Sequence, residues 1–200
     1  GQQIFLEQVP MGPEIYRTVR WGKDLQIWLV EGRDFRSPNS IQDGPEKTIW
    51  GHQQKTWFKQ TVRDSDATFR ILISPTPVVG PDREKKNDNH ANKGFKHEGD
   101  DLRRFIGQQK NMVVICGDRH WQYVSVDPIT GLREYSSGPT SNQHAGGFKR
   151  EYQQPMHQYL NICGGFLLAR VERINEQPLL TIRHHSVTGE ILNQDKLTAE

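Results

Sequence analysis

Two short apolar runs in the middle of the chain predict buried β-strands. The first is Phe69–Ser74, which ends before Pro75, and the second is Met112–Cys116, which is apolar throughout. Runs of this length and composition are typical of strands that are covered on both faces of a sheet. We therefore expect the centre of the hydrophobic core to lie near the middle of the chain.

Two other segments place apolar residues three or four positions apart, which is the spacing of an amphipathic helix. Thr48 can cap the first helix, which we expect to end near Val62, and the second helix follows Phe95. Their apolar residues are Trp50, Trp57, Phe58 and Val62 in the first, and Phe95, Leu102, Phe105 and Ile106 in the second. The pattern predicts alternating strands and helices, with the aromatic residues of the first helix buried against the sheet that contains Phe69–Ser74.

Alternation of polar and apolar residues on both sides of this centre predicts antiparallel strands. Turn-forming residues separate several of them, as in β-hairpins. The expected strands span residues 15–21, 25–30, 121–126, 133–136, 166–174, 178–185 and a short 190–192. Because no stretch reads as a linker, we expect residues 1–200 to form a single α/β domain with antiparallel strands around its core.

Composition and charge exclude several classes of protein. Hydrophobic residues make up 34% of the 200, and Lys plus Arg total 26 against 24 for Asp plus Glu. A net charge of +2 argues against a dedicated nucleic-acid-binding surface, which would carry an obvious basic excess. No apolar run approaches the roughly 18 residues of a membrane-spanning helix, and the N-terminus lacks the pattern of a signal peptide. Two cysteines, Cys116 and Cys163, do not make a disulfide framework.

Residues 78–98 form a long polar stretch without periodicity. A loop of this length inside a compact domain is usually functional or disordered. Its low apolar content predicts that residues 78–95 are mobile. Asn89 and His90 lie at its centre, and these residue types orient phosphate or donate protons. A solvated loop without function is the alternative interpretation.

The segment after the second apolar run carries the strongest candidate chemistry. Asp118 and His120 follow Met112–Cys116 and Gly117, two residues apart, and in an extended chain such residues point the same way. A carboxylate and an imidazole at the carboxyl end of a strand suit zinc, iron or manganese, and an extra carboxylate would admit calcium. The alternative is an ordinary turn.

A third cluster, residues 136–144, is rich in Ser, Thr, Gly and Asn. Hydroxyls and backbone amides in such a loop can hold an anion, which makes Asn142 and His144 candidate substrate contacts. An ordinary turn is again the alternative. His184 and His185 receive no role, because adjacent residues of a strand point to opposite faces. The sequence contains no phosphate-loop motif, no Gly-x-Ser-x-Gly and no His-Glu-x-x-His.

Several segments in order resemble the PhoD-like metallophosphatases, a group of alkaline phosphatases and phosphodiesterases within the calcineurin-like phosphoesterases. They are residues 16–22, 29–36, 50–58, 88–90, the helix that contains Glu98, and residues 117–121. The resemblance implies mixed β-sheets packed face to face with flanking helices, and a metal-activated hydroxide that attacks a phosphate ester. It also implies calcium and iron, or other divalent ions such as zinc or manganese, and an extracytoplasmic location, periplasmic or secreted.

Individual roles follow from the same resemblance. Asp118 and His120 match the last block of metal ligands, and Asn89 and His90 fall in the loop near the substrate pocket, where they are candidate catalytic residues. Arg119 lies between the two metal-ligand candidates, and its charge alone makes it a candidate for binding the phosphate.

One departure from the family pattern is large. The chain has no Gly-Asp-x-x-Asp block, and Ser74-Pro75-Thr76 stands where many metallophosphatases have a histidine. A metal centre needs about four ligands, and Asp118 with His120 supplies two. We therefore expect the C-terminal part of such an enzyme, which folds but is inactive alone. The alternative is a non-catalytic α/β domain that binds an anion or a partner protein, and the pattern does not distinguish between oligomeric states.

Overall fold

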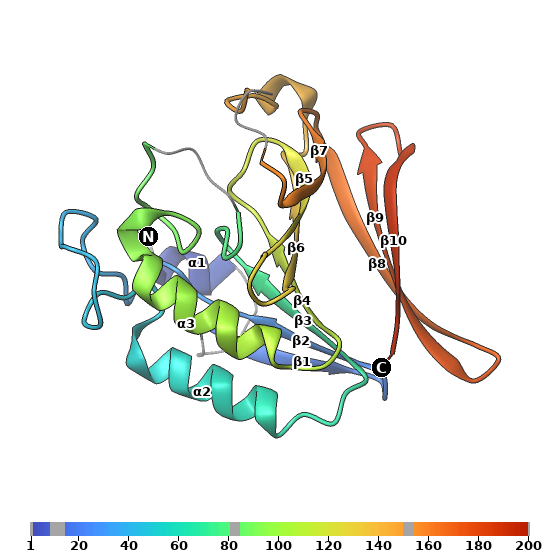
Figure 1. The fold of residues 1–200 in the computed structure, drawn as a ribbon, viewed down its shortest axis with the longest axis horizontal. Coiled ribbons are helices and arrows are strands. Elements are labelled where there is room, and N and C mark those ends of the chain that lie inside the picture. Colours follow the sequence, from blue (N-terminus) through green and yellow to red (C-terminus); the bar gives the residue numbers. More distant parts are fainter. Residues whose placement is uncertain (1, 9–14, 81–84, 150–153, 200) are drawn as a thin grey trace.

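A computed structural model describes residues 2–8, 15–80, 85–149 and 154–199. A seven-stranded mixed sheet has helices on one face and a three-stranded antiparallel sheet on the other (Figure 1). None of the described helices is long and apolar enough to cross a membrane. The helices are α1 (Gln2–Gln8), α2 (Gly51–Arg63) and α3 (Lys96–Gly107), with short 3₁₀ turns at Lys93–Phe95 and Asn142–His144.

The larger sheet has the strand order β1-β2-β3-β4-β6-β5-β7. Its strands are β1 (Arg17–Trp21), β2 (Leu25–Leu29), β3 (Phe69–Ser74), β4 (Met112–Cys116), β5 (Gln122–Val126), β6 (Arg133–Ser137) and β7 (His157–Asn161). The four strands β2, β3, β4 and β6 are parallel neighbours, whereas β1 and β5 run antiparallel to theirs. The carboxyl ends of the four parallel strands therefore meet at one edge of the sheet.

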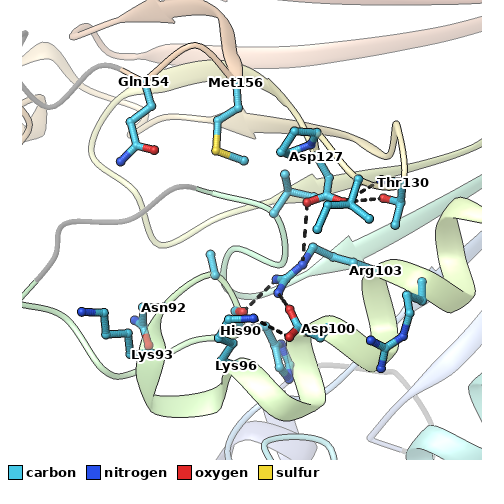
Figure 2. A pocket seen from close by; sticks show the side chains of 15 residues that line it. His90, Asn92, Lys93, Lys96, Asp100, Arg103, Asp127, Thr130, Gln154 and Met156 are labelled. Atoms are coloured by element: carbon cyan, nitrogen blue, oxygen red, sulfur yellow. Dashed lines mark hydrogen bonds and ion pairs between the residues drawn. The ribbon is translucent and has the colours of Figure 1, made fainter.

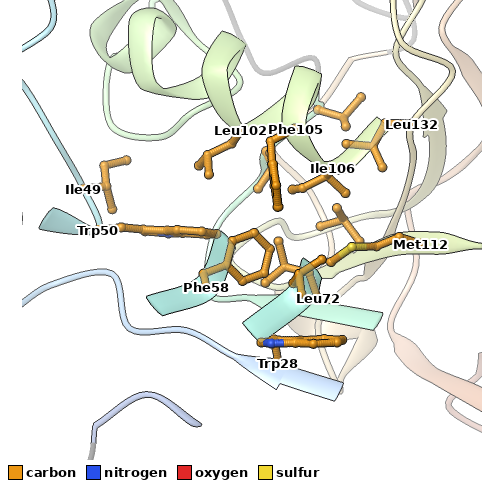
Figure 3. Close-up of a cluster of buried hydrophobic side chains, with 14 of the residues drawn as sticks. Trp28, Ile49, Trp50, Phe58, Leu72, Leu102, Phe105, Ile106, Met112 and Leu132 are labelled. Carbon is orange, nitrogen blue, oxygen red and sulfur yellow. The ribbon is translucent and has the colours of Figure 1, made fainter. Parts of the chain in front are cut away.

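Aromatic side chains of α2 fill the core between the helices and the larger sheet (Figure 3). Phe58 is fully buried, and its ring makes edge-to-face contacts with Trp28, Trp50 and Phe105 at 5.1–6.4 Å. Trp57 is half-buried and packs on the ring of Tyr16, with the centroids 4.7 Å apart. The predicted burial of this helix is therefore confirmed for Trp50 and Phe58 and partial for Trp57.

The smaller sheet consists of β8 (Gly165–Ile174), β9 (Gln177–Ser186) and β10 (Ile191–Thr198), and it covers the other face of the larger sheet. Leu180 and Ile182 of β9 belong to the same buried cluster as Ile71 and Val113 of the larger sheet. The cover is incomplete near β1, because the side chain of Trp21 is 72% exposed on this face.

Most of the expected elements are present at the expected places. Both buried strands have the predicted bounds, and the predicted hairpin strands correspond to β1 with β2 and to β8 with β9. Helix α2 begins at Gly51, and the Thr48 hydroxyl accepts the backbone N–H of Gly51. Sequence patterns missed α1 and β7, and β10 is longer than the expected 190–192, since β9 pairs with it as far as Thr198.

Two buried histidines contribute to the packing of the larger sheet and the smaller one. His157 in β7 contacts the Ser125 hydroxyl through Nδ1, at 2.7 Å, and His184 in β9 contacts the Ser136 carbonyl oxygen through Nε2, at 3.0 Å. Burial lowers the pKa of each imidazole from 6.5 to about 4. Both rings are therefore neutral in the folded protein near pH 6, where an exposed histidine is largely protonated.

Acid is expected to destabilise the fold through these histidines. Unfolding returns each imidazole to its ordinary pKa, so their stabilising effect is complete above pH 6.5 and declines as the pH falls toward 4. Urea titrations at pH 7 and 5 should show a loss on the order of 1 kcal/mol for each histidine. The variants His157→Gln and His184→Gln should flatten this pH dependence, and the exposed His52→Gln should not. An unchanged slope in both buried variants would contradict the prediction.

Candidate functional site

Four segments converge where the parallel strands of the larger sheet end. They are residues 31–39 after β2, 75–80 and 85–95 after β3, 117–121 after β4 and 138–148 after β6. Ligands of α/β proteins bind outside the carboxyl ends of such strands. The candidate residues predicted from the sequence, Asp118 to His120 among them, all belong to these segments.

The segment after β4 is a bend and not an extended chain. Asp118 has φ 69°, in the left-handed region. The prediction that Asp118 and His120 point the same way assumed an extended chain, and that assumption is wrong. Both side chains are nevertheless exposed at the strand end. Arg119 between them is 5% exposed, and its Nη2 lies 3.1 Å from Asp118 Oδ2.

The two predicted metal ligands have the right chemistry for part of a metal centre. A carboxylate and an imidazole are ligands of iron, zinc and manganese, and both are accessible from solvent. Among residues 2–8, 15–80, 85–149 and 154–199, however, no group of three or more His, Cys, Asp and Glu side chains could hold a metal ion. The described residues therefore supply two donors of suitable type, and further donors would have to come from elsewhere.

Two guanidinium groups flank Asp88 in the segment after β3. Arg36 Nη2 donates to the Asp88 carbonyl oxygen at 2.6 Å and to Asn39 Oδ1 at 2.7 Å. Arg119 Nη2 lies 3.8 Å from Asp88 Oδ1. Burial lowers the pKa of Arg36, and the positive charge of Arg33 lowers it further. The negative charges of Asp88 and Asp118 oppose this shift but do not cancel it. Arg36 is not among the candidate residues predicted from the sequence, although its place just after a parallel strand was a usable signal.

Asn89 and His90 are both fully buried. Asn89 Oδ1 accepts the backbone N–H of Ala91 at 2.9 Å, which shapes the turn. His90 Nε2 lies 2.9 Å from Glu98 Oε2, and its ring stands at 89° to that of Trp50. The predicted catalytic pair thus lies beneath the site surface, and a catalytic role for either residue stays a prediction.

Burial within residues 85–95 exceeds what their composition suggested. Asn89, His90 and Phe95 are each 0% exposed, so the argument that this polar segment cannot bury enough surface is wrong for this part of it. Residues 81–84 of the same predicted loop lie outside the described residues. The guanidinium of Arg36 and the ammonium of Lys47 each lie over the Phe95 ring, at 4.7 and 4.3 Å from its centroid.

A buried carboxylate on β6 fixes the chain after β3. Glu134 is 0% exposed, and its two oxygens accept the backbone N–H groups of Val78, Val79 and Gly80 at 2.6–3.0 Å. The Tyr123 hydroxyl donates to the same carboxylate at 2.7 Å. These bonds hold residues 78–80 against β6.

The loop after β6 lies beside His120. The backbone N–H of Gly146 donates to the His120 carbonyl oxygen at 2.9 Å. Asn142 and His144 are exposed in a 3₁₀ turn, and Asn142 Oδ1 accepts the backbone N–H of Gly164. The structure therefore brings these two candidate substrate contacts to the same edge as Asp118 and His120.

A cavity of about 510 Å³ lies between α3, the turn after His90 and the β5–β6 turn (Figure 2). Its walls include Lys93, Lys96, Arg103 and Thr130, and of the candidate site residues it touches only His90. Arg103 Nη1 donates to the carbonyl oxygens of Val78 and His90, which ties α3 to the segment after β3.

Comparisons with known proteins give a family from the sequence and a fold from the structure. The sequence profile of the family described as PhoD-like phosphatase matches residues 1–161. No curated protein sequence matches the chain. Among solved structures, PhoD is similar with a TM-score of 0.70 and 17% identity, over 98% of this chain and 44% of that one.

Two further structures share the fold. GAP50, described as the anchor in the inner membrane complex of Plasmodium, has a TM-score of 0.62 and 13% identity, over 94% of this chain and 56% of that one. The purple acid phosphatase PPD1 from yellow lupin (Lupinus luteus) seeds has a TM-score of 0.64 and 11% identity, over 92% of this chain and 32% of that one. These likenesses confirm the predicted metallophosphatase-type fold, and the chain spans between 32% and 56% of the length of these three structures.

Proposed function

The chain belongs to the PhoD-like phosphatase family, and on that premise we propose that its strand-end site is one part of a phosphoesterase active site. One observation carries the proposal: two guanidinium groups, Arg36 and Arg119, flank Asp88 beside a carboxylate and an imidazole of metal-ligand type. Guanidinium groups bind phosphate oxygens in a planar, two-point geometry. The substrate is a phosphate monoester or diester, and family relation favours an extracytoplasmic location.

Each candidate residue then has a role. Arg119 and Arg36 bind the non-bridging phosphate oxygens, and Asn142 and His144 contact the substrate from the loop after β6. Asp118 and His120 are the residues that would hold a metal ion, calcium or iron by family resemblance. A metal ion held by these two residues would supply Lewis-acid chemistry, since it would polarise a phosphoryl oxygen and lower the pKa of bound water to near neutrality.

The residues that the structure describes supply only part of this site. Two metal donors are half of the usual four, and PhoD is more than twice as long as the part that matches this chain. Two guanidinium groups can donate hydrogen bonds to phosphate oxygens, and two donors can bind a metal ion weakly. They are not enough to fix a nucleophile in line with the scissile bond.

The chain is therefore expected to bind Mn²⁺ or Zn²⁺ weakly and to show no measurable hydrolysis of p-nitrophenyl phosphate. Calorimetric titration with each metal should give binding that His120→Ala and Asp118→Asn abolish and that the exposed His52→Ala leaves unchanged. Metal binding that survives both site variants would refute the ligand assignment. Rapid hydrolysis that His120→Ala abolishes would show that the chain holds a complete site.

One observation favours the alternative, a non-catalytic domain that binds an anion or a partner protein. The carboxylate of Asp118 already forms an ion pair with Arg119, 3.1 Å away, which weakens its attraction for a metal ion. Phosphate binding without any metal binding in the same titrations would support this second function.

A further inference from the structure

Glu98 on α3 is a buried carboxylate that accepts hydrogen bonds from distant parts of the chain. Its side chain is 2% exposed. Oε2 accepts from His90 Nε2 at 2.9 Å and from the backbone N–H groups of Ile49 and Trp50 at 2.6 and 3.4 Å. Oε1 accepts from the Thr48 hydroxyl at 2.5 Å and from Lys55 Nζ at 3.2 Å.

These bonds keep Glu98 ionised in spite of its burial. Desolvation raises the pKa of this carboxyl, but the hydrogen bonds and charges of His90, with those of Thr48 and Ile49, outweigh it and lower the pKa to about 2. An ionised carboxylate only accepts hydrogen bonds, so the ring nitrogen of His90 that faces it carries a hydrogen. Glu98 therefore fixes both the tautomer and the orientation of the His90 ring, which the edge of Trp50 also confines.

The fixed ring determines where Asp88 lies. His90 is two residues from Asp88, and Asn89 Oδ1 accepts the N–H of Ala91, a bond that shapes the turn around His90. The Asp88 carbonyl oxygen accepts from Arg36, and its carboxylate lies 3.8 Å from Arg119. A shift of the His90 ring would move Asp88 relative to both guanidinium groups.

We propose that Glu98 is a positioning residue for the proposed phosphate site. Through the N–H of His90 it holds the Asp88 turn between Arg36 and Arg119, and so sets the spacing of the two guanidinium groups. This inference rests on the proposed function for its purpose, because the two groups matter only if they bind phosphate together. A purely structural role for Glu98, as an anchor for the start of α2, is the competing explanation.

Two variants, called the link variants, interrupt the hydrogen bond between Glu98 and His90. A third variant removes the hydrogen bond between Glu98 and Thr48. His90→Ala removes the donor to Glu98 and leaves the bonds to Ile49 and Trp50. Glu98→Gln has one acceptor oxygen in place of two. Whichever way the amide is oriented, either the donors at Oε2, which include His90, or the donors at Oε1 lose their acceptor. Thr48→Ala removes a hydrogen bond on the α2 side and serves as the matched control.

The first readout is the Nε–H signals of Arg36 and Arg119 in ¹⁵N–¹H spectra of the chain, assigned with Arg36→Lys and Arg119→Lys. Both signals should shift in His90→Ala and Glu98→Gln and stay in place in Thr48→Ala. His90→Gln should restore them, because its side-chain amide can donate from about the same position as Nε2. Unchanged signals in both link variants, or equal shifts in Thr48→Ala, would overturn the positioning role.

The second readout is the affinity for inorganic phosphate, measured by titration of the same signals. The link variants should weaken binding about ten-fold, as small displacements of preorganised groups do, and Thr48→Ala should not. Equal affinity in His90→Ala and the unmodified chain would also overturn the proposal. If the unmodified chain shows no response to phosphate, the proposed function of the Arg36–Arg119 pair fails, and the first readout still decides the role of Glu98.

Discussion

Replacing Glu134 by alanine is expected to lower the free energy of unfolding by about 3–5 kcal/mol. The substitution leaves the backbone N–H groups of Val78, Val79 and Gly80 without an acceptor in the interior. Each buried donor without a partner costs about 1–3 kcal/mol, and partial relaxation of the loop reduces the sum. Chemical denaturation followed by circular dichroism measures the effect.

Two further variants separate the possible causes of this loss. Tyr123→Phe removes the hydroxyl that donates to Glu134 and contacts Cys116 Sγ, and it should cost about 1 kcal/mol. The exposed Glu46→Ala should change stability by less than about 0.5 kcal/mol. If Glu134→Ala were as mild as Glu46→Ala, the carboxylate would not be what holds the chain after β3.

Replacing Phe58 by alanine is expected to destabilise the fold by about 3–5 kcal/mol, through lost transfer energy and a cavity at the centre of the helix layer. The ring is 0% exposed and meets three other aromatic rings edge to face, with Trp28 on one side and Phe105 on the other. Edge-to-face contacts contribute beyond the buried area. The midpoint of thermal unfolding should fall accordingly.

Thr56→Ala on the exposed side of α2 is the matched control, because it changes the same helix without opening a cavity. It should leave the midpoint nearly unchanged or raise it slightly, since alanine favours helix more than threonine. Phe58→Leu should lie between the two, as it keeps most of the apolar volume. A Phe58→Ala variant as stable as Thr56→Ala would mean that the core closes around the missing ring.

Parts of the fold were predictable because local patterns and tertiary environment agreed. The bounds of β3 and β4 follow from apolar runs that the sheet buries on both faces. The pattern failed for β7, where His157–Asn161 mixes polar and aromatic residues because its neighbours supply hydrogen-bond partners for His157 and Tyr159. The pattern also predicted too early an end for β10. The residues after Leu192 are largely polar, and they continue as an edge strand because they pair with β9.

The sequence predicted at which edge of the sheet the candidate residues lie, but not their conformation or their contacts. Chain order put the candidates after parallel strands, which is enough to bring Asp118, His120 and Asn142 to one edge. The left-handed conformation of Asp118 has no local signature such as glycine, so the extended-chain argument could not anticipate it. Three partners of Glu98, namely Thr48, Ile49 and Trp50, lie 48 to 50 positions away in sequence, and no periodicity encodes contacts of that range.

The uneven cover of the larger sheet has an optical consequence. Of the five tryptophans, Trp28, Trp50 and Trp121 are at most 1% exposed and Trp57 is half-buried, whereas Trp21 on β1 is 72% exposed. A soluble quencher such as acrylamide therefore reaches Trp21 first, and the red edge of the emission reports mainly on that indole. Any molecule that covers the face near β1 will move the emission to shorter wavelength, so the protein carries its own fluorescent probe for this part of its surface.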